Sequence, residues 1–156
     1  KKTSVKFRTD VASMCKLGFD IGLQDLTADE LVYCRQAVAN WKRLQGVILD
    51  GTQYRLVSPY ESNHMALNYV STDAAKALLF AYDIHPRFKE KLHRVKPQGL
   101  DPDRTYRVEE INLMPGAKPT LKAHGLSFSG DYLMKVGLEV FGQEAAQSHV
   151  VELTAD

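Results

Sequence analysis

Cysteine and long apolar runs are both scarce in this sequence. Its longest uninterrupted apolar stretch, residues 77–82, is far shorter than the roughly 20 residues that a membrane-spanning helix needs. The only two cysteines, Cys15 and Cys34, are too few for a disulfide framework. Both have apolar neighbours, so we expect them to be buried, reduced thiols.

Neither sign of charge is in excess. The 20 Lys and Arg residues are balanced by 19 Asp and Glu residues, so the basic footprint of a nucleic-acid-binding domain is absent. The five histidines have none of the paired spacings of metal sites, and the chain has no glycine-rich nucleotide loop and no G-x-S-x-G motif. We therefore expect no nucleic-acid or membrane partner, no metal and no cofactor.

Residues 28–45 carry the clearest secondary-structure signal, which predicts a helix. Thr27 and Glu30 have the spacing of a capping box at its start. Gly46 is a stop signal just past its last turn. Apolar side chains recur along it at helical spacing, forming a stripe of Leu31, Cys34, Val38 and Trp41.

Upstream of this helix, residues 11–15 predict a short strand, followed by a loop through Gly18 and Gly22. Strand, loop and helix make one βα unit, which cannot form a domain alone because its strand has no parallel neighbour. The chain does not begin with Met, so we expect it to start inside a longer protein. Lys1 and Lys2 precede polar residues instead of the apolar stretch of a signal peptide, which favours a cytoplasmic over a secreted location.

From residue 52 onward the pattern is that of an antiparallel β-protein. Runs rich in β-branched and aromatic residues alternate with turn signals, as in a sandwich or barrel. The predicted strands are residues 53–58, 64–71, 76–83, 89–95, 106–113, 132–140 and 149–154. The fold class is therefore mainly β, an antiparallel β-sandwich at residues 51–156 preceded by one βα unit at residues 1–50. We expect the β-part to fold by itself.

Few residues suggest chemistry. Asp101 and Asp103 flank a proline and are best explained as a turn, while Glu109 and Glu110 are adjacent in a strand and point to opposite faces. Neither pair can supply the two convergent carboxyl groups of a glycosidase. The basic run of residues 87–94 suggests the solvent-facing lysines of an edge strand. Four tyrosines are candidates for core packing or for sugar stacking: Tyr60, Tyr69, Tyr82 and Tyr132.

Several segments in one order resemble the C-terminal end of glycoside hydrolase family 36, the bacterial and fungal α-galactosidases. The segments are FRTDVASM at 7–14, LGFD at 17–20, YRLVSPYE at 54–61, GLDPD at 99–103, YRV at 106–108, SGDYLM at 129–134 and VGL at 136–138. They span nearly the whole chain. The resemblance assigns residues 1–50 to the last strand and helix of a (β/α)₈ catalytic barrel, and residues 51–156 to the C-terminal β-domain. A whole barrel needs about 250 residues, so only its end is present.

The resemblance implies a parent enzyme that is a retaining hydrolase, releasing terminal α-linked galactose from oligosaccharides without a metal or cofactor. Its two catalytic aspartates lie on earlier barrel strands, so no catalytic residue is expected here. Ser13, Met14 and Cys15 follow the predicted barrel strand and are candidate positions at the barrel rim. The implied partners are the upstream barrel, the α-galactoside substrate of the parent and a second copy in a homo-oligomer.

We weigh three functions for this chain and expect the first, with the other two as alternatives. The first is a non-catalytic domain that scaffolds the barrel or forms subunit contacts. The second is a carbohydrate-binding module, which would bind glycans on its own. The third is a free-standing structural β-domain.

Overall fold

The computed structural model describes residues 3–156, so Lys1 and Lys2 lie outside it. Its core is one six-stranded antiparallel sheet with the order β1-β2-β3-β6-β4-β5. The strands are β1 (Thr52–Val57), β2 (His64–Val70), β3 (Lys76–Asp83), β4 (Thr105–Ile111), β5 (Ser127–Ser129) and β6 (Gln147–Ala155). The helices are α1 (Val5–Ser13), α2 (Ala28–Asp50) and α3 (Gly130–Lys135), with a short 3₁₀ turn, η1 (Leu23–Asp25).

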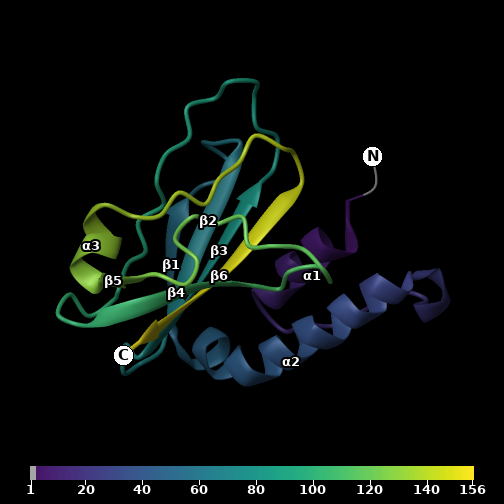
Figure 1. Ribbon diagram of the computed structural model, residues 1–156, viewed down its shortest axis with the longest axis horizontal. Coiled ribbons are helices and arrows are strands. Elements are labelled where there is room, and N and C mark those ends of the chain that lie inside the picture. Colours follow the sequence, from purple (N-terminus) through teal and green to yellow (C-terminus); the bar gives the residue numbers. More distant parts are fainter. Residues whose placement is uncertain (1–2) are drawn as a thin grey trace.

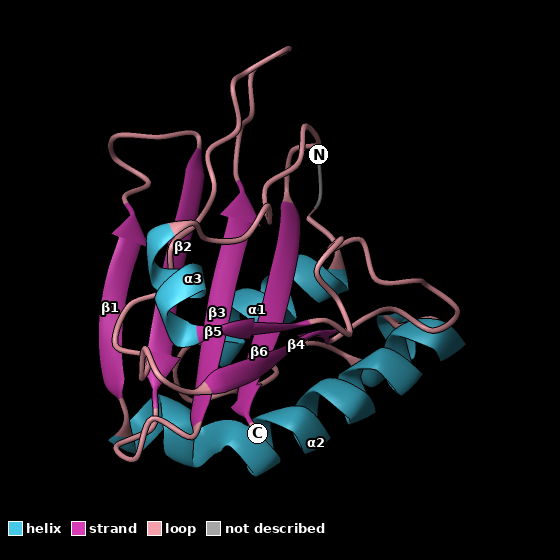
Figure 2. Cartoon of the chain, turned by 60° about the vertical axis from the view of Figure 1, so that its left-hand side comes forward, coloured by secondary structure: helices cyan, strands magenta, loops and turns pink. Residues whose placement is uncertain are grey.

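The sheet is the middle layer of the molecule. Helices α1 and α2 lie on one face, and α3 with the long loops lies on the other (Figures 1 and 2). The antiparallel, β-rich character is therefore confirmed, whereas the predicted pairing of two sheets in a sandwich is wrong. An apolar strand pattern predicts burial but not what does the burying, and here helices and loops cover the sheet instead of a second sheet.

Strand β3 contains the longest apolar run of the chain and is the most buried part of the sheet, where it lies between β2 and β6. Its side chains alternate between two cores. Leu78 and Phe80 pack with Leu44 and Ile48 of α2 on the helical face. On the opposite face, Leu79 packs in a cluster that includes loop residues Val95, Leu100, Leu121 and Leu138.

Residues 11–15 do not form the predicted strand, because α1 occupies residues Val5–Ser13. The hydroxyl of Ser4 accepts a hydrogen bond from the backbone N–H of Phe7 at 3.1 Å and caps this helix. Lys6 and Asp10 then form an i,i+4 ion pair along it. The leftover unit is thus two helices in place of a strand and a helix.

Helix α2 begins as predicted, with both hydrogen bonds of the Thr27–Glu30 capping box present. It passes through Gly46 and ends at Gly51, where a Cβ would collide with the backbone oxygens of Val47 and Val70. The buried face of α2 also differs from the predicted stripe: Tyr33 and Ala37 are buried in place of their neighbours Cys34 and Val38. The buried residues of the helix are Tyr33, Ala37, Leu44, Val47 and Ile48. The predicted stripe residues are only partly buried.

Two predicted strands are absent from the described part of the chain. Residues 89–95 form a loop, because Lys89 has a φ of +58° and the carboxylate of Glu90 accepts from the backbone N–H of Arg87 at 2.8 Å. Within residues 132–140, α3 takes the first part: the hydroxyl of Ser129 caps it by accepting from Tyr132 N at 3.1 Å. Leu138 then makes a single β-bridge with Val95. The other five predicted strands match β1, β2, β3, β4 and β6 within two residues at each end.

Candidate functional site

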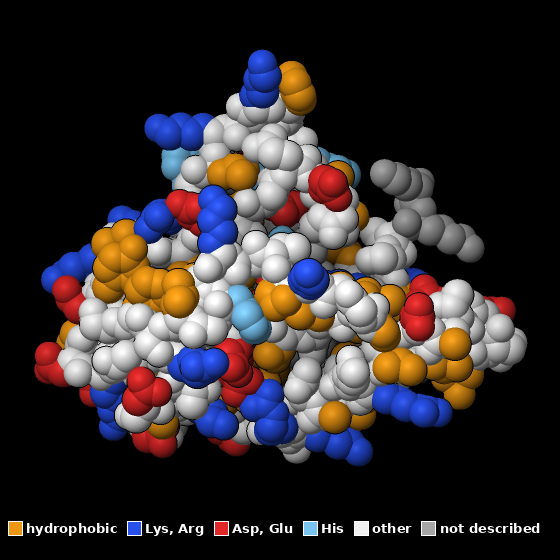
Figure 3. Space-filling view, viewed as in Figure 1, with side chains coloured by type: hydrophobic (Ala, Val, Ile, Leu, Met, Phe, Trp, Pro, Cys, Tyr) orange, Lys and Arg blue, Asp and Glu red, His pale blue; other side chains and the backbone are white. Residues whose placement is uncertain are grey.

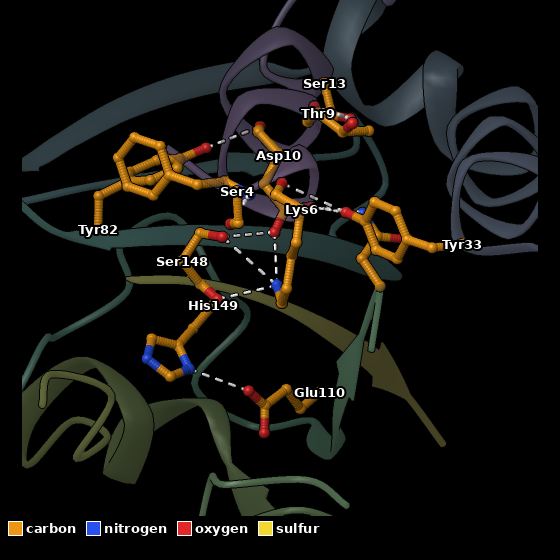
Figure 4. A network of polar contacts seen from close by, with 12 residues as sticks. Ser4, Lys6, Thr9, Asp10, Ser13, Tyr33, Tyr82, Glu110, Ser148 and His149 are labelled. Carbon is orange, nitrogen blue, oxygen red and sulfur yellow. Dashed lines mark hydrogen bonds and ion pairs between the residues drawn. The ribbon is translucent and has the colours of Figure 1, made fainter. Parts of the chain in front are cut away.

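A buried polar cluster joins the helices to the sheet (Figure 4). At its centre is Asp10 of α1, whose side chain is fully buried. Its carboxylate pairs with Lys6 at 2.5 Å and accepts hydrogen bonds from Tyr33 of α2 at 3.0 Å and from Ser148 of β6 at 2.7 Å. Asn112, after β4, donates to the same carboxylate at 3.0 Å. We call these five residues the junction cluster.

The junction cluster is well satisfied, which is what keeps a buried carboxylate tolerable. Lys6 also donates to the backbone oxygen of Ser148 at 2.9 Å, so its ammonium bridges α1 and β6. Burial, together with the adjacent Asp10 charge, raises the pKa of Tyr33 far above its usual value. Tyr33 therefore stays a neutral donor, and the cluster acts as a fixed joint between the helices and the sheet.

The predicted barrel-rim residues lie beside this joint. Ser13 is buried, and its hydroxyl donates to the backbone oxygen of Thr9 at 2.8 Å. The backbone oxygen of Met14 accepts from Tyr69 at 2.7 Å, and that of Cys15 accepts from the Trp41 indole at 2.9 Å. The structure thus places the three positions where the helical layer meets the sheet, held mainly through their backbone.

Cys15 is exposed and Cys34 is half-buried, and both are free thiols. The expectation that both are buried is therefore wrong. Helix α1 ends at Ser13, so Cys15 lies in the turn after it, where the side chain is exposed while the backbone oxygen accepts from Trp41.

A second polar cluster lies on the opposite face of the sheet. Ser148 and His149 are neighbours in β6, so they point to opposite faces, and Figure 4 shows His149 turned toward Glu110. His149 Nδ1 lies 2.9 Å from a Glu110 oxygen, and its Nε2 lies 3.6 Å from the carboxylate of Asp83. Asp83 in turn lies 2.8 Å from His64 Nδ1. We call His64, Asp83, Glu110 and His149 the histidine cluster.

Charge pairing dominates the histidine cluster. Burial acts to lower the pKa of His149, but its contacts with Asp83 and Glu110 outweigh burial and raise that pKa to about 9. Burial acts to raise the pKa of Glu110, but His149 and the backbone N–H groups of Leu121 and Thr120 outweigh it and lower that pKa to about 2. At neutral pH, His149 is therefore a cation held between carboxylates, and it cannot act as a general base.

The two carboxylate pairs behave as the sequence predicted. Asp101 accepts from the backbone N–H of Asp103 at 3.0 Å, which is a turn contact. Glu109 pairs with Arg107 in solvent, while Glu110 is buried against His149 on the other face. Over residues 3–156, no group of three or more His, Cys, Asp or Glu side chains is arranged to hold a metal ion.

No pattern in the sequence indicates the junction cluster. Its five members are spread from residue 6 to residue 148, and buried polar residues have no periodic pattern. One signal was available for Tyr33, which falls at helical spacing with Ala37 and Leu44 of α2.

Comparison with known proteins decides the family. Residues 64–153 match the Glycosyl hydrolase family 36 C-terminal domain. The chain belongs to this family. Family 36 was also the resemblance carried by the sequence segments, and it is confirmed.

Individual relatives align with most or all of this family 36 chain. It is 30% identical over 154 residues, or 98% of its length, to probable alpha-galactosidase G of Aspergillus terreus. It is 35% identical over 135 residues to probable alpha-galactosidase C of Aspergillus flavus. The crystal structure of the GH36 alpha-galactosidase AgaB from Geobacillus stearothermophilus matches 100% of this chain with a TM-score of 0.84 and 27% identity.

The chain spans about a fifth of the length of the relatives it matches: 19% of the Aspergillus terreus protein and 20% of AgaB. In the described part of the chain, no helix combines the length and apolar character needed to cross a bilayer. Because the matching family model is that of the C-terminal domain, the family 36 assignment applies to a C-terminal, β-rich region.

Proposed function

We propose that this chain is the C-terminal part of an α-galactosidase, and that it supports the catalytic barrel without taking part in catalysis. The observation that carries the proposal is the match of the entire chain to 20% of the GH36 α-galactosidase AgaB, at a TM-score of 0.84. The family model that matches residues 64–153 is that of the C-terminal domain. Relatives of this kind act on α-galactosides: a solved AgaA variant from Geobacillus stearothermophilus is in complex with raffinose. The parent of this chain would share that substrate class.

In this proposal residues 1–50 are the end of the barrel domain and residues 51–156 are the C-terminal β-domain. The family match begins at residue 64 and ends at residue 153, within the second part. The two parts are joined by the junction cluster and by the apolar contacts of α2 with β2 and β3. Such a joint would hold the barrel end and the β-domain in a fixed relation.

The end of the molecule formed by α1, η1 and the start of α2 is where the upstream barrel would lie. Large apolar side chains are exposed there without a covering element: Val11, Phe19, Leu23 and Val32. Two hollows of 140 and 970 Å³ open at the same end and share Val5, Arg8 and Ile21 in their walls. Exposed apolar groups beside grooves mark a surface that packs against another element.

A hydrolysis assay tests the proposal. The purified chain is incubated with a chromogenic α-galactoside, alone and after co-expression with the polypeptide encoded upstream in its gene. We expect no turnover by the chain alone, because a retaining glycosidase needs two carboxyl groups about 5–5.5 Å apart, and the resemblance to family 36 implies that both lie on the upstream barrel. Turnover by the chain alone, retained through further purification, would overturn the non-catalytic role.

A second candidate function is glycan binding. Two of the four tyrosines that the sequence offers for sugar stacking are buried and therefore cannot contact a sugar. Tyr69 and Tyr82 are buried and donate to backbone oxygens of Met14 and Asp10. Tyr60 is almost fully exposed on its own, and Tyr132 lies in a groove. The position of Tyr132 in this groove is the observation that favours glycan binding as a second candidate.

A further inference from the structure

A groove lies on the sheet face opposite α1 and α2, beside α3. Two hollows of 310 and 450 Å³ adjoin there and share the lining residues Arg94, Leu121, Lys122 and Glu139. We call the space formed by both hollows the α3 groove. Each volume falls within the range of about 300–1,000 Å³ that is usual for small-molecule sites.

An aromatic pair forms one wall of the α3 groove. The rings of Phe128 in β5 and Tyr132 in α3 are stacked, with centroids 5.1 Å apart and planes 12° from parallel. Tyr132 is 37% exposed and the neighbouring Leu126 is 52% exposed. Figure 3 shows hydrophobic side chains gathered over α3 and β5, with Lys and Arg side chains beside them. The stack holds the Tyr132 ring in one orientation at the groove surface.

A polar pair stands next to the aromatic wall. Arg94 donates from Nη2 to Glu139 Oε1 at 2.7 Å and from Nη1 to the Tyr132 hydroxyl at 3.4 Å. Lys122 reaches the other Glu139 oxygen at 3.4 Å. A guanidinium has five N–H donors and a carboxylate about four acceptor positions. Arg94 uses two of its donors and Glu139 about half of its acceptor positions. The Arg94 and Glu139 side chains are 41% and 50% exposed, which leaves the remaining capacity open to a ligand.

This combination matches the chemistry of a sugar ring. A pyranose has a face of C–H groups that packs on an aromatic ring, and a rim of hydroxyls that each donate and accept. In the α3 groove, the Tyr132 ring would meet the face, while Arg94 and Glu139 would serve adjacent hydroxyls. Glu139 offsets part of the charge of Arg94 and Lys122, so the groove does not favour a polyanion. We infer that the α3 groove binds a neutral oligosaccharide.

A protein partner fits the groove less well. Stable protein interfaces bury about 800 Å² on each side, whereas the exposed apolar area here is a small patch within a concave, charged rim. The choice of α-galactosides as the first ligands rests on the proposed function, whereas the inference that the groove binds an oligosaccharide rests on its geometry alone. The test of this inference therefore measures binding and not catalysis.

The test is isothermal titration of the full chain with raffinose and with stachyose, with maltotriose as a sugar lacking galactose. We expect saturable binding that weakens about tenfold in Tyr132→Ala, a loss of about 1.4 kcal/mol. Tyr132→Phe keeps the ring and should retain most of the affinity. Arg94→Gln should weaken binding while leaving the aromatic wall intact. Tyr60→Ala removes an exposed tyrosine outside the groove and is the matched control, with no change expected.

Thermal unfolding of each variant separates lost binding from lost folding. Binding of maltotriose in place of raffinose, with the same dependence on Tyr132, would support an oligosaccharide groove and remove its link to galactosides. No binding of any of the three sugars by the folded chain would overturn the inference. Equal binding by wild type, Tyr132→Ala and Arg94→Gln would also overturn it, as would self-association that depends on Tyr132 without sugar binding.

Discussion

The hydroxyl of Tyr82 in β3 donates a hydrogen bond to the backbone oxygen of Asp10 in α1 at 2.8 Å, although the residues are 72 positions apart. The Asp10 side chain meanwhile binds groups from α2, from β6 and from the chain after β4. One residue of α1 thus contacts four separate parts of the fold. Its contacts make the helical segment and the sheet dependent on each other.

Asp10→Ala should be strongly destabilising. It removes the carboxylate that pairs with Lys6, and the remaining ammonium is largely buried. Breaking a buried ion pair by removing one partner costs about 3–5 kcal/mol. Chemical denaturation monitored by circular dichroism measures the change. Asp20→Ala, at an exposed aspartate, is the control and should leave the unfolding midpoint unchanged; equal midpoints for the two variants would contradict the account of the junction cluster.

Leu44→Ala should destabilise the chain through the core between α2 and the sheet. Leu44 is 2% exposed and packs with Leu78 and Phe80, so its truncation should cost about 2–5 kcal/mol. Leu49 lies on the same helix but is 48% exposed, and Leu49→Ala is the matched control. Thermal melting of both variants checks this. A larger loss for Leu49→Ala would show that α2 packs through a different face.

Stability should fall at both ends of the pH range because of the histidine cluster. His149 has a pKa raised from 6.5 to about 9, so its contribution is complete below about 6.5 and is lost as the pH rises through 9. Glu110 has a pKa lowered from 4.5 to about 2, so its contribution is complete above about 4.5 and is lost as the pH falls toward 2.

Denaturation at a series of pH values measures both effects. His149→Gln should flatten the loss between pH 6.5 and 9, since it removes the raised pKa. His85→Gln, at an exposed histidine, should leave the alkaline loss as it is. An unchanged pH profile in His149→Gln would show that the histidine cluster does not govern alkaline stability.

The parts of the fold that the sequence predicted are those with a local signal. The capping box at Thr27 and the apolar run of β3 each depend on neighbouring residues, and both were confirmed. The single sheet was missed because an apolar face records burial but not whether a helix or a second sheet covers it. The strand assigned to residues 11–15 failed because a run of five residues is too short to distinguish strand from helix, and the decisive cap at Ser4 lies outside it.

The sites were harder to predict than the strands. Asp10, Tyr33 and Ser148 meet only through the packing of α1 and α2 on the sheet, so no spacing along the chain reveals them. The opposite orientation of Glu109 and Glu110 was predictable, because it follows from the two-residue period of a strand alone.

A chain limited to residues 51–156 should not fold as a stable unit, contrary to the expectation from the sequence. This shortened chain lacks α1 and α2, so one face of its sheet would expose Leu67, Leu78, Phe80 and Val150. We expect binding of a hydrophobic dye and no cooperative thermal transition. Adding a peptide of residues 1–50 should reduce the dye signal. Cooperative melting within a few degrees of the full chain, in the absence of the peptide, would contradict this prediction.

Reconstitution of α-galactosidase activity tests the central claim most directly. The upstream polypeptide of the parent is expressed alone and together with this chain, and hydrolysis of a chromogenic α-galactoside is measured for each preparation and for the chain alone. The account predicts activity only when the two polypeptides are present together, with both recovered in one complex. Full activity of the upstream polypeptide alone, or hydrolysis by this chain alone, would contradict a non-catalytic supporting role.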